Sequence, residues 1–319
     1  KRSRINRWLE RLLDERFEDR VSRHMVDLDR CSGDLHEVLY ISFSRAFGQK
    51  VNADPFEMLA RSVSLQKILD NCPDQISREA LLFGQAGMLG QSGMLDRSGK
   101  SGHSGKLDHL GKLRQAAMLG KADDYYSELC RLFFDFGRKS GLRSRLGLTP
   151  VEGYLWKFLR LRPDNFPTIR ISQLAYSIGR YPDMFGELIG ADDPMKFVMG
   201  MELKASEYWS THYRFGRPST EREKRIGRNR MSGLFVNAFL PVLFAFRRVE
   251  GKKLKGFDFP DMLAGMRAED NRVIRMWKGL GLEVPDLRSS QAILQLTNNY
   301  CKFRRCLSCY VGSQIIQSS

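Results

Sequence analysis

The sequence predicts an all-α fold, a multi-helix globular array with a flexible insertion rich in Gly, Ser and Lys. Apolar residues recur at steps of three and four along most of the chain, the spacing of one helical face. No stretch alternates strictly between apolar and polar residues as a half-buried strand does. Hydrophobic residues make up 42% of the 319 residues, which is typical of a globular protein with an ample core.

The N-terminal segment is expected to be one long helix. Its apolar residues share a single helical face: Ile5, Trp8, Leu9, Leu12, Leu13, Phe17, Val21, Met25 and Leu28. Because the first residue is Lys1 and the helix begins at once, we expect the chain to start within a longer protein. Any targeting segment would then lie upstream.

The next helix boundaries have recognisable signals. Gly48 is expected to end one helix, and Asp54-Pro55-Phe56-Glu57 resembles a capping box with Asp54 as N-cap. The helical period predicts further helices over 75–89, 123–139, 151–161, 171–178, 183–188, 201–213, 231–248, 261–278 and 289–300.

The run from Met231 to Phe246 is apolar enough to raise the question of a membrane span. A span needs roughly twenty apolar residues, whereas this run contains Asn237 and Pro241 and is about sixteen long. We therefore expect a buried core helix kinked at the proline, and no transmembrane segment.

Composition divides the chain into three parts. An N-terminal helical part covers 1–89, a low-complexity flexible loop covers 90–122, and the main helical part covers 123–319; the helical parts are expected to pack as one domain. In the loop, Gly-Gln-Ala-Gly-Met-Leu is followed at once by Gly-Gln-Ser-Gly-Met-Leu. The loop's Gly93-x5-Gly99-Lys100-Ser101 has one residue too many for a phosphate-binding loop.

The charge balance indicates a polyanionic partner. Fifty-two Lys and Arg against 37 Asp and Glu give a formal charge of +15, which favours DNA, RNA or an anionic surface. The basic residues gather in three clusters, and the first two are the candidate nucleic-acid contacts. The first cluster is Arg160, Arg162 and Arg170, around a Pro163–Pro167 loop. The second is Arg217, Arg222, Lys224, Arg225, Arg228 and Arg230, and the third is Arg247, Arg248, Lys252, Lys253 and Lys255. Solvated loops carry such residues too, so a merely basic surface is the alternative.

A dense group of polar and aromatic residues is a second candidate site. It comprises Glu207, Tyr208, His212, Tyr213 and Arg214. Three of them, Glu207, Tyr208 and His212, would share one surface at helical spacing. The alternatives are a packed structural network and an enzyme site using Glu207, His212 and Tyr213. Common hydrolase and dinucleotide motifs do not occur in the sequence.

Three cysteines near the C-terminus have spacing that suits a metal. Cys306-x2-Cys309 matches a metal knuckle, Cys301 offers a third thiolate, and Gly312 permits a tight turn, so zinc or an iron–sulfur cluster is a candidate cofactor. The flanking basic residues are expected to lower the thiol pKa values. No fourth ligand is identified, and merely neighbouring thiols are the alternative. Six cysteines in so long a chain suit a reducing, cytoplasmic compartment.

Five phrases of the chain together resemble a bacterial family of uncharacterised proteins, domain of unknown function 2851. They are Glu79-Ala80-Leu81-Leu82-Phe83-Gly84-Gln85-Ala86-Gly87, 155–163, Ser206-Glu207-Tyr208-Trp209, Glu269-Asp270-Asn271-Arg272 and Tyr300-Cys301 to Cys309. The resemblance implies a further N-terminal region with a nuclease-like metal site in full-length members. Residues 90–122 depart from the family pattern.

The resemblance changes the weight of the basic charge. Beside a nuclease-like region, a basic helical domain would hold the nucleic-acid backbone and have no catalytic residues of its own. The competing interpretation is a structural or protein-interaction module whose arginines pair with its own acids.

Overall fold

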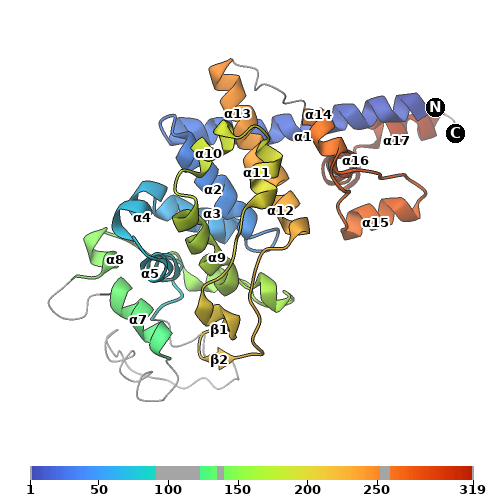
Figure 1. Cartoon of the computed structure of the whole chain (residues 1–319). Coiled ribbons are helices and arrows are strands. Elements are labelled where there is room, and N and C mark those ends of the chain that lie inside the picture. The colour runs from blue at the N-terminus through green and yellow to red at the C-terminus, as the bar shows by residue number, and fades with distance from the viewer. Residues whose placement is uncertain (1, 91–122, 135–139, 252–258, 318–319) are drawn as a thin grey trace. The chain divides into compact units, whose positions relative to one another are not determined.

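The computed structural model describes residues 2–90, 123–134, 140–251 and 259–317 (Figure 1). The chain forms two compact units. Unit 1 combines Lys1–Gly33 with Leu240–Ser319, and unit 2 is Asp34–Phe239. This division differs from the expected boundaries at 89/90 and 122/123, because the first helix packs on helices from the C-terminal part. The predicted flexible loop lies, apart from Gly90, outside the described residues.

Unit 2 contains the larger share of the helices. They are α2 (Leu35–Phe47), α3 (Ala53–Ser62), α4 (Leu65–Asn71), α5 (Gln75–Gln85), α7 (Asp124–Phe133), α8 (Leu142–Arg145), α9 (Pro167–Arg180), α10 (Met184–Gly190), α11 (Pro194–Gly200) and α12 (Arg228–Leu234). The shorter elements are the 3-10 turns η1 (Gly153–Leu155), η2 (Pro163–Asn165) and η3 (Glu207–Ser210), the π-helical turn η4 (Phe235–Phe239), and strands β1 (His212–Arg214) and β2 (Arg217–Pro218).

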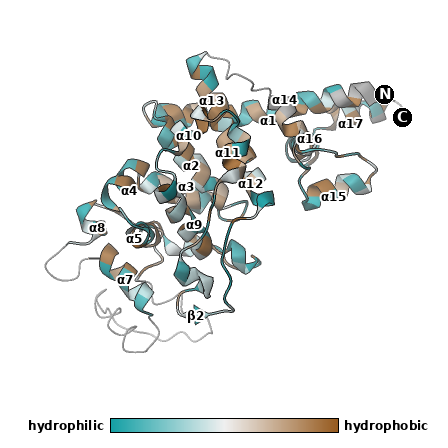
Figure 2. Ribbon diagram, viewed as in Figure 1, coloured by the Kyte–Doolittle hydropathy of each residue, from teal (hydrophilic) through white to brown (hydrophobic). Residues whose placement is uncertain are grey.

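The core of unit 2 lies between α2, α5 and the helices packed on them. The hydropathy colouring shows α2 as a largely hydrophobic helix, in keeping with its eight buried residues (Figure 2). Helix α5 packs against both α7 and α9. Its Gly84 lies against the ring of Phe133 from α7, where a Cβ would come within 2.2 Å of the ring. The close packing of α5 on α7 therefore requires glycine at this position.

Unit 1 is built on the long helix α1 (Arg2–Arg30), which confirms the predicted N-terminal helix. The other elements are α13 (Leu240–Glu250), α14 (Phe259–Ala264), α15 (Arg272–Gly279), α16 (Leu287–Gln295), the π-helical turn η5 (Leu296–Cys301), the 3-10 turn η6 (Cys306–Ser308) and α17 (Tyr310–Gln317). Helix α1 packs against α13 and α16. Polar contacts join α1 to the C-terminal part, among them Arg16 Nε donating to Gln291 at 2.8 Å and Tyr300 donating to Glu15 at 2.7 Å.

The all-α prediction is confirmed. In the described part of the chain the single sheet is the two-stranded antiparallel pair β1–β2. Gly48 caps α2 as expected, and a Cβ there would lie 2.1 Å from the Asn52 carbonyl oxygen. The expected N-cap at Asp54 was wrong: α3 begins at Ala53 after Asn52, and the Asp54 carboxylate accepts from Arg45 at 2.8 Å.

Two predicted helices do not form. Residues 151–161 contain the short turn η1 and irregular chain, because long-range partners hold the backbone: Trp156 Nε1 donates to the Ala86 carbonyl at 2.8 Å. Residues 201–213 run extended into η3 and β1, with Ala205 N donating to the Lys224 carbonyl at 3.0 Å. The predicted 261–278 helix is broken into α14 and α15.

The apolar helix is longer than its sequence suggested. Arg228–Glu250 is 23 residues long and, by length and composition, the single helix in the described ranges that could cross a membrane. A buried core helix passes the same test. Within this helix, 56% of the most apolar 18-residue stretch is buried inside the protein, and Phe235 and Phe239 are completely buried. The turn η4 widens the helix just before Pro241, which cannot donate a backbone hydrogen bond.

Candidate functional site

Two arginines of the first basic cluster, Arg160 and Arg162, are on a closed, irregular loop, Phe158–Phe166, which we call the arginine loop; Arg170 follows on α9. The rings of Phe158 and Phe166 meet edge to face at 5.2 Å and close its two ends. Arg162 and Phe166 are extended, as residues before proline are, and Pro167 starts α9. Between them Pro163–Asn165 forms the turn η2, so the loop is not extended throughout.

The arginine loop is fixed to the core at its N-terminal side. The Asn52 side chain accepts from Lys157 N and donates to the Lys157 carbonyl, both at 2.9 Å. Arg160 has φ +63°, a left-handed conformation that is uncommon outside glycine. Its neighbour Leu159 is 82% exposed. The loop therefore presents Leu159, Arg160 and Arg162 to solvent from an anchored base.

Arginines from distant parts of unit 2 meet at this loop. Asn165 Oδ1 accepts from Arg170 at 2.8 Å and from Arg230 at 3.0 Å. Asp164 accepts from Arg222 at 2.5 Å and from the Tyr213 hydroxyl at 3.1 Å. The two candidate clusters therefore come together around Asp164 and Asn165.

The candidate basic residues differ in exposure. Arg170 is 4% exposed, also donates to Gln173, and has its pKa lowered to about 9 by burial and by the adjacent Arg230. Lys224 is buried too, with Nζ donating to the Ser210 carbonyl at 2.7 Å and lying 4.2 Å from the Tyr213 ring centre. These two side chains support the surface from below instead of facing solvent.

Among the exposed candidates, Arg225 pairs with Glu202 and Glu223. Arg160, Arg162 and Arg228 are exposed, and their guanidinium groups have no hydrogen-bond or ion-pair partner among the described residues. Arg214 lies over the rings of Phe158 and Phe166, 5.1 Å from each centre. Of the third cluster, Lys252, Lys253 and Lys255 lie outside the described residues.

The predicted polar-aromatic group is brought together only in part. Tyr208, His212 and Tyr213 lie in one region of η3 and β1, while Glu207 is exposed. The rings of Tyr125, Tyr208 and His212 stack in parallel, with centroid distances of 4.0 Å and 4.2 Å. The Tyr208 hydroxyl forms a short hydrogen bond with Asp123, and Gly216 N donates to both groups.

Sequence reasoning missed the buried carboxyl group beneath this stack. Glu79 on α5 is 1% exposed, and burial raises its pKa even though its oxygens accept several hydrogen bonds. The donors are the side chains of Gln75, Tyr125, Ser172 and Ser206. A signal was present, since Glu79 is one helical turn before the buried Phe83 and shares its face.

The three C-terminal cysteines differ in exposure. Cys301 and Cys306 are exposed, whereas Cys309 is buried. Across the described ranges, no group of three His, Cys, Asp or Glu side chains is placed to hold a metal ion. The Cys301 pKa is raised, by burial and by the neighbouring Cys309 and Cys306, not lowered as the flanking basic residues suggested. Metal binding here stays a prediction.

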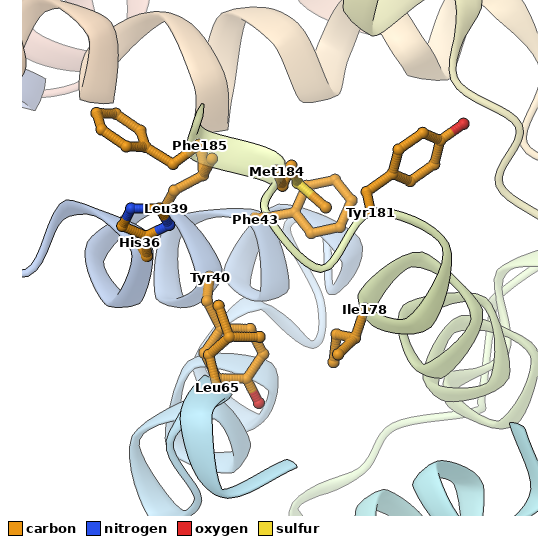
Figure 3. Close-up of a pocket in the computed structure, with 9 residues that line it drawn as sticks. All are labelled: His36, Leu39, Tyr40, Phe43, Leu65, Ile178, Tyr181, Met184 and Phe185. Carbon is orange, nitrogen blue, oxygen red and sulfur yellow. The ribbon is translucent and has the colours of Figure 1, made fainter. Parts of the chain in front are cut away.

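Unit 2 also contains a small cavity among α2, α4, α9 and α10 (Figure 3). Its lining is largely apolar, for example Phe43, Ile178 and Met184. His36, at its edge, lies 3.3 Å from an Asp183 oxygen and meets the Phe185 ring edge-on. This lining resembles a packing gap between core helices more than a site that binds a charged ligand.

The fold and the surface described above define a basic helical protein of two compact units with an arginine-rich loop. The chain belongs to the family described as Protein of unknown function (DUF2851), whose sequence profile matches residues 1–272. Cys301 to Cys309 lie beyond the matched residues. No curated protein and no solved structure matches the chain.

Proposed function

We propose that unit 2 binds the phosphate backbone of DNA or RNA through the arginine loop and the arginines that meet it. The observation that supports this proposal is the meeting of two basic clusters, separate in sequence, around one anchored loop that leaves Arg160 and Arg162 exposed. Guanidinium groups bind phosphate oxygens in a planar, bidentate geometry. Because several guanidinium groups lie on one surface, their electric fields add and attract a polyanion.

In this proposal the domain is the binding part of a larger, nuclease-like protein and performs no catalysis itself. The six free cysteines support a reducing, cytoplasmic setting for that protein.

Replacing Arg160 and Arg162 together by Ala is expected to weaken binding of a short oligonucleotide by about tenfold at low salt, as expected for two exposed charge contacts. Fluorescence anisotropy of a labelled oligonucleotide measures this. The matched control is Arg61→Ala with Arg131→Ala, which removes the same charge from residues that pair with Glu57 and Glu128. Equal losses in both double variants would mean that only net charge matters and would contradict a specific role for the loop.

The second candidate function is a structural or protein-interaction module. The pairing of Arg222 with Asp164 and of Arg225 with Glu202 favours it, since these arginines are satisfied internally. Asp164→Asn separates the two candidates. It removes a negative charge from the arginine loop and releases Arg222, so a phosphate-binding loop should bind the oligonucleotide several-fold more tightly. The matched control is Asp54→Asn, which removes an exposed carboxylate bound to Arg45. If the domain is an interaction module, Asp164→Asn should change oligonucleotide affinity no more than this control does.

A further inference from the structure

A ladder of three parallel rings lies beside the arginine loop. Tyr125 from α7, Tyr208 from η3 and His212 from β1 stack with interplanar angles of 15° and 7°. Trp209 meets Tyr208 and Tyr125 nearly at right angles, at 87° and 89°, with centroids 5.0 Å and 6.0 Å away. Phe215 is tilted by 31° and 28° to the same two rings, with centroids 6.4 Å and 6.3 Å away. The ladder rings, 4.0 Å and 4.2 Å apart, therefore lie closer to one another than Trp209 or Phe215 lies to Tyr125 or Tyr208.

Hydrogen bonds fix each ring of the ladder. Tyr125 donates to the buried Glu79 at 2.7 Å, and Tyr208 donates to Asp123. His212 Nδ1 is 3.1 Å from the Tyr208 carbonyl oxygen and 3.0 Å from Thr211 Oγ1. The carbonyl can only accept, whereas the Thr211 hydroxyl can donate or accept, so both contacts hold Nδ1 and leave Nε2 for another partner. Among the described residues, Nε2 has no hydrogen-bond partner.

The two ends of the ladder differ. At one end the hydroxyl of the half-buried Tyr125 is bound to the buried carboxyl group of Glu79. At the other end His212 is half-buried. The strand that holds His212 continues into Tyr213, whose hydroxyl donates to Asp164 of the arginine loop. The half-buried ring and the phosphate-binding surface are thus joined through adjacent residues.

We propose that His212 is a stacking site for an unpaired base, so that the ligand of this surface is a single-stranded nucleic acid. This inference rests on the proposed phosphate binding and names its substrate class. A base on His212 would extend the ladder by one ring, and Nε2 would form a hydrogen bond with the base or its neighbour. Bases within a duplex are already stacked and paired, whereas a single strand offers a free π-face.

His212→Ala in the full chain is expected to weaken binding of a labelled oligothymidylate roughly fivefold or more, since one base loses its stacking partner. Binding of a duplex of the same length should change much less. His212→Phe keeps a stacking ring and should retain most of the single-strand affinity. His36→Ala is the matched control, since it removes a histidine from an aromatic contact elsewhere in unit 2.

A second measurement locates the base directly. A photoreactive oligonucleotide with iodouracil in place of thymine should crosslink to the peptide that contains Tyr208 and His212. Crosslinks confined to other peptides, or single-strand affinities of His212→Ala equal to wild type, would overturn the stacking site. If His212→Ala binds normally while the Arg160/Arg162 double variant is weak, phosphate binding stands and the stacking proposal fails. If both variants bind normally, the proposed function itself fails.

Discussion

Replacing Glu79 by Ala is expected to lower the free energy of unfolding by about 4 kcal/mol or more, because each buried donor left without an acceptor costs about 1–3 kcal/mol. Gln75, Tyr125, Ser172 and Ser206 would all lose their shared acceptor. Urea unfolding followed by circular dichroism measures the loss.

Glu79→Gln is the control that separates the charge from the hydrogen bonds. Its amide oxygen still accepts from two donors, and the hydroxyls of Tyr125 and Ser206 can turn to accept from the amide nitrogen. We expect a smaller loss than for Glu79→Ala. Equal loss in both variants would show that the carboxylate charge, and not the acceptor network, stabilises this part of the core.

The raised pKa of Glu79 also predicts that stability depends on pH, which a comparison of the wild type with Glu79→Gln can measure. Burial raises the folded-state pKa of Glu79 above its ordinary value of 4.5. As the pH rises, the unfolded chain therefore releases the Glu79 proton before the folded protein does. The stability that protonated Glu79 contributes is fully present below about pH 4.5, and it is lost as the pH rises through the folded-state pKa. The wild type should lose stability relative to Glu79→Gln over that window. A constant difference between the two proteins would contradict the raised pKa.

Gly87→Ala is the second substitution with a large expected effect, about 3 kcal/mol or more of lost stability from left-handed strain and overpacking together. Gly87 has φ +66°, and a Cβ would lie 2.2 Å from the Val151 carbonyl oxygen. That backbone cannot easily retreat, since Val151 N donates to the Gln85 carbonyl at 2.7 Å.

Gly147→Ala separates the left-handed strain from the overpacking. Gly147 has a similar φ of +61°, but nothing lies within 4 Å of a Cβ there. We expect Gly147→Ala to cost about 1 kcal/mol, the left-handed strain alone. Thermal unfolding of both variants tests this, and similar losses at the two glycines would mean that the close approach of residues 87 and 151 is not a constraint.

Much of the fold could be predicted because local patterns determine it. The apolar stripe of α1, the end of α2 at Gly48 and the helix over 171–178 each follow from nearby residues. The failures over 151–161 and 201–213 have a different cause. In both, partners far away in sequence hold the backbone outside a helix, as the Asn52 side chain does at Lys157. Periodicity within a window cannot report such partners.

The candidate site shows the same limit. The residue types of the basic clusters indicated an anionic ligand, and their meeting point at Asp164 and Asn165 depends on tertiary packing. Sequence could not separate the buried Arg170 from the exposed Arg160 and Arg162. The ladder was also hidden, because Tyr125 is far from Tyr208 and His212 in the chain.

The salt dependence of oligothymidylate binding tests the central claim, phosphate binding by the arginine loop, most directly. Each phosphate neutralised on a single strand contributes about 0.7 to the slope of log affinity against log salt. The account predicts a steep slope for the wild type, reduced by about one unit or more in the Arg160/Arg162 double variant and unchanged in the Arg61/Arg131 control. A shallow wild-type slope, or the same slope in the arginine-loop variant, would contradict it.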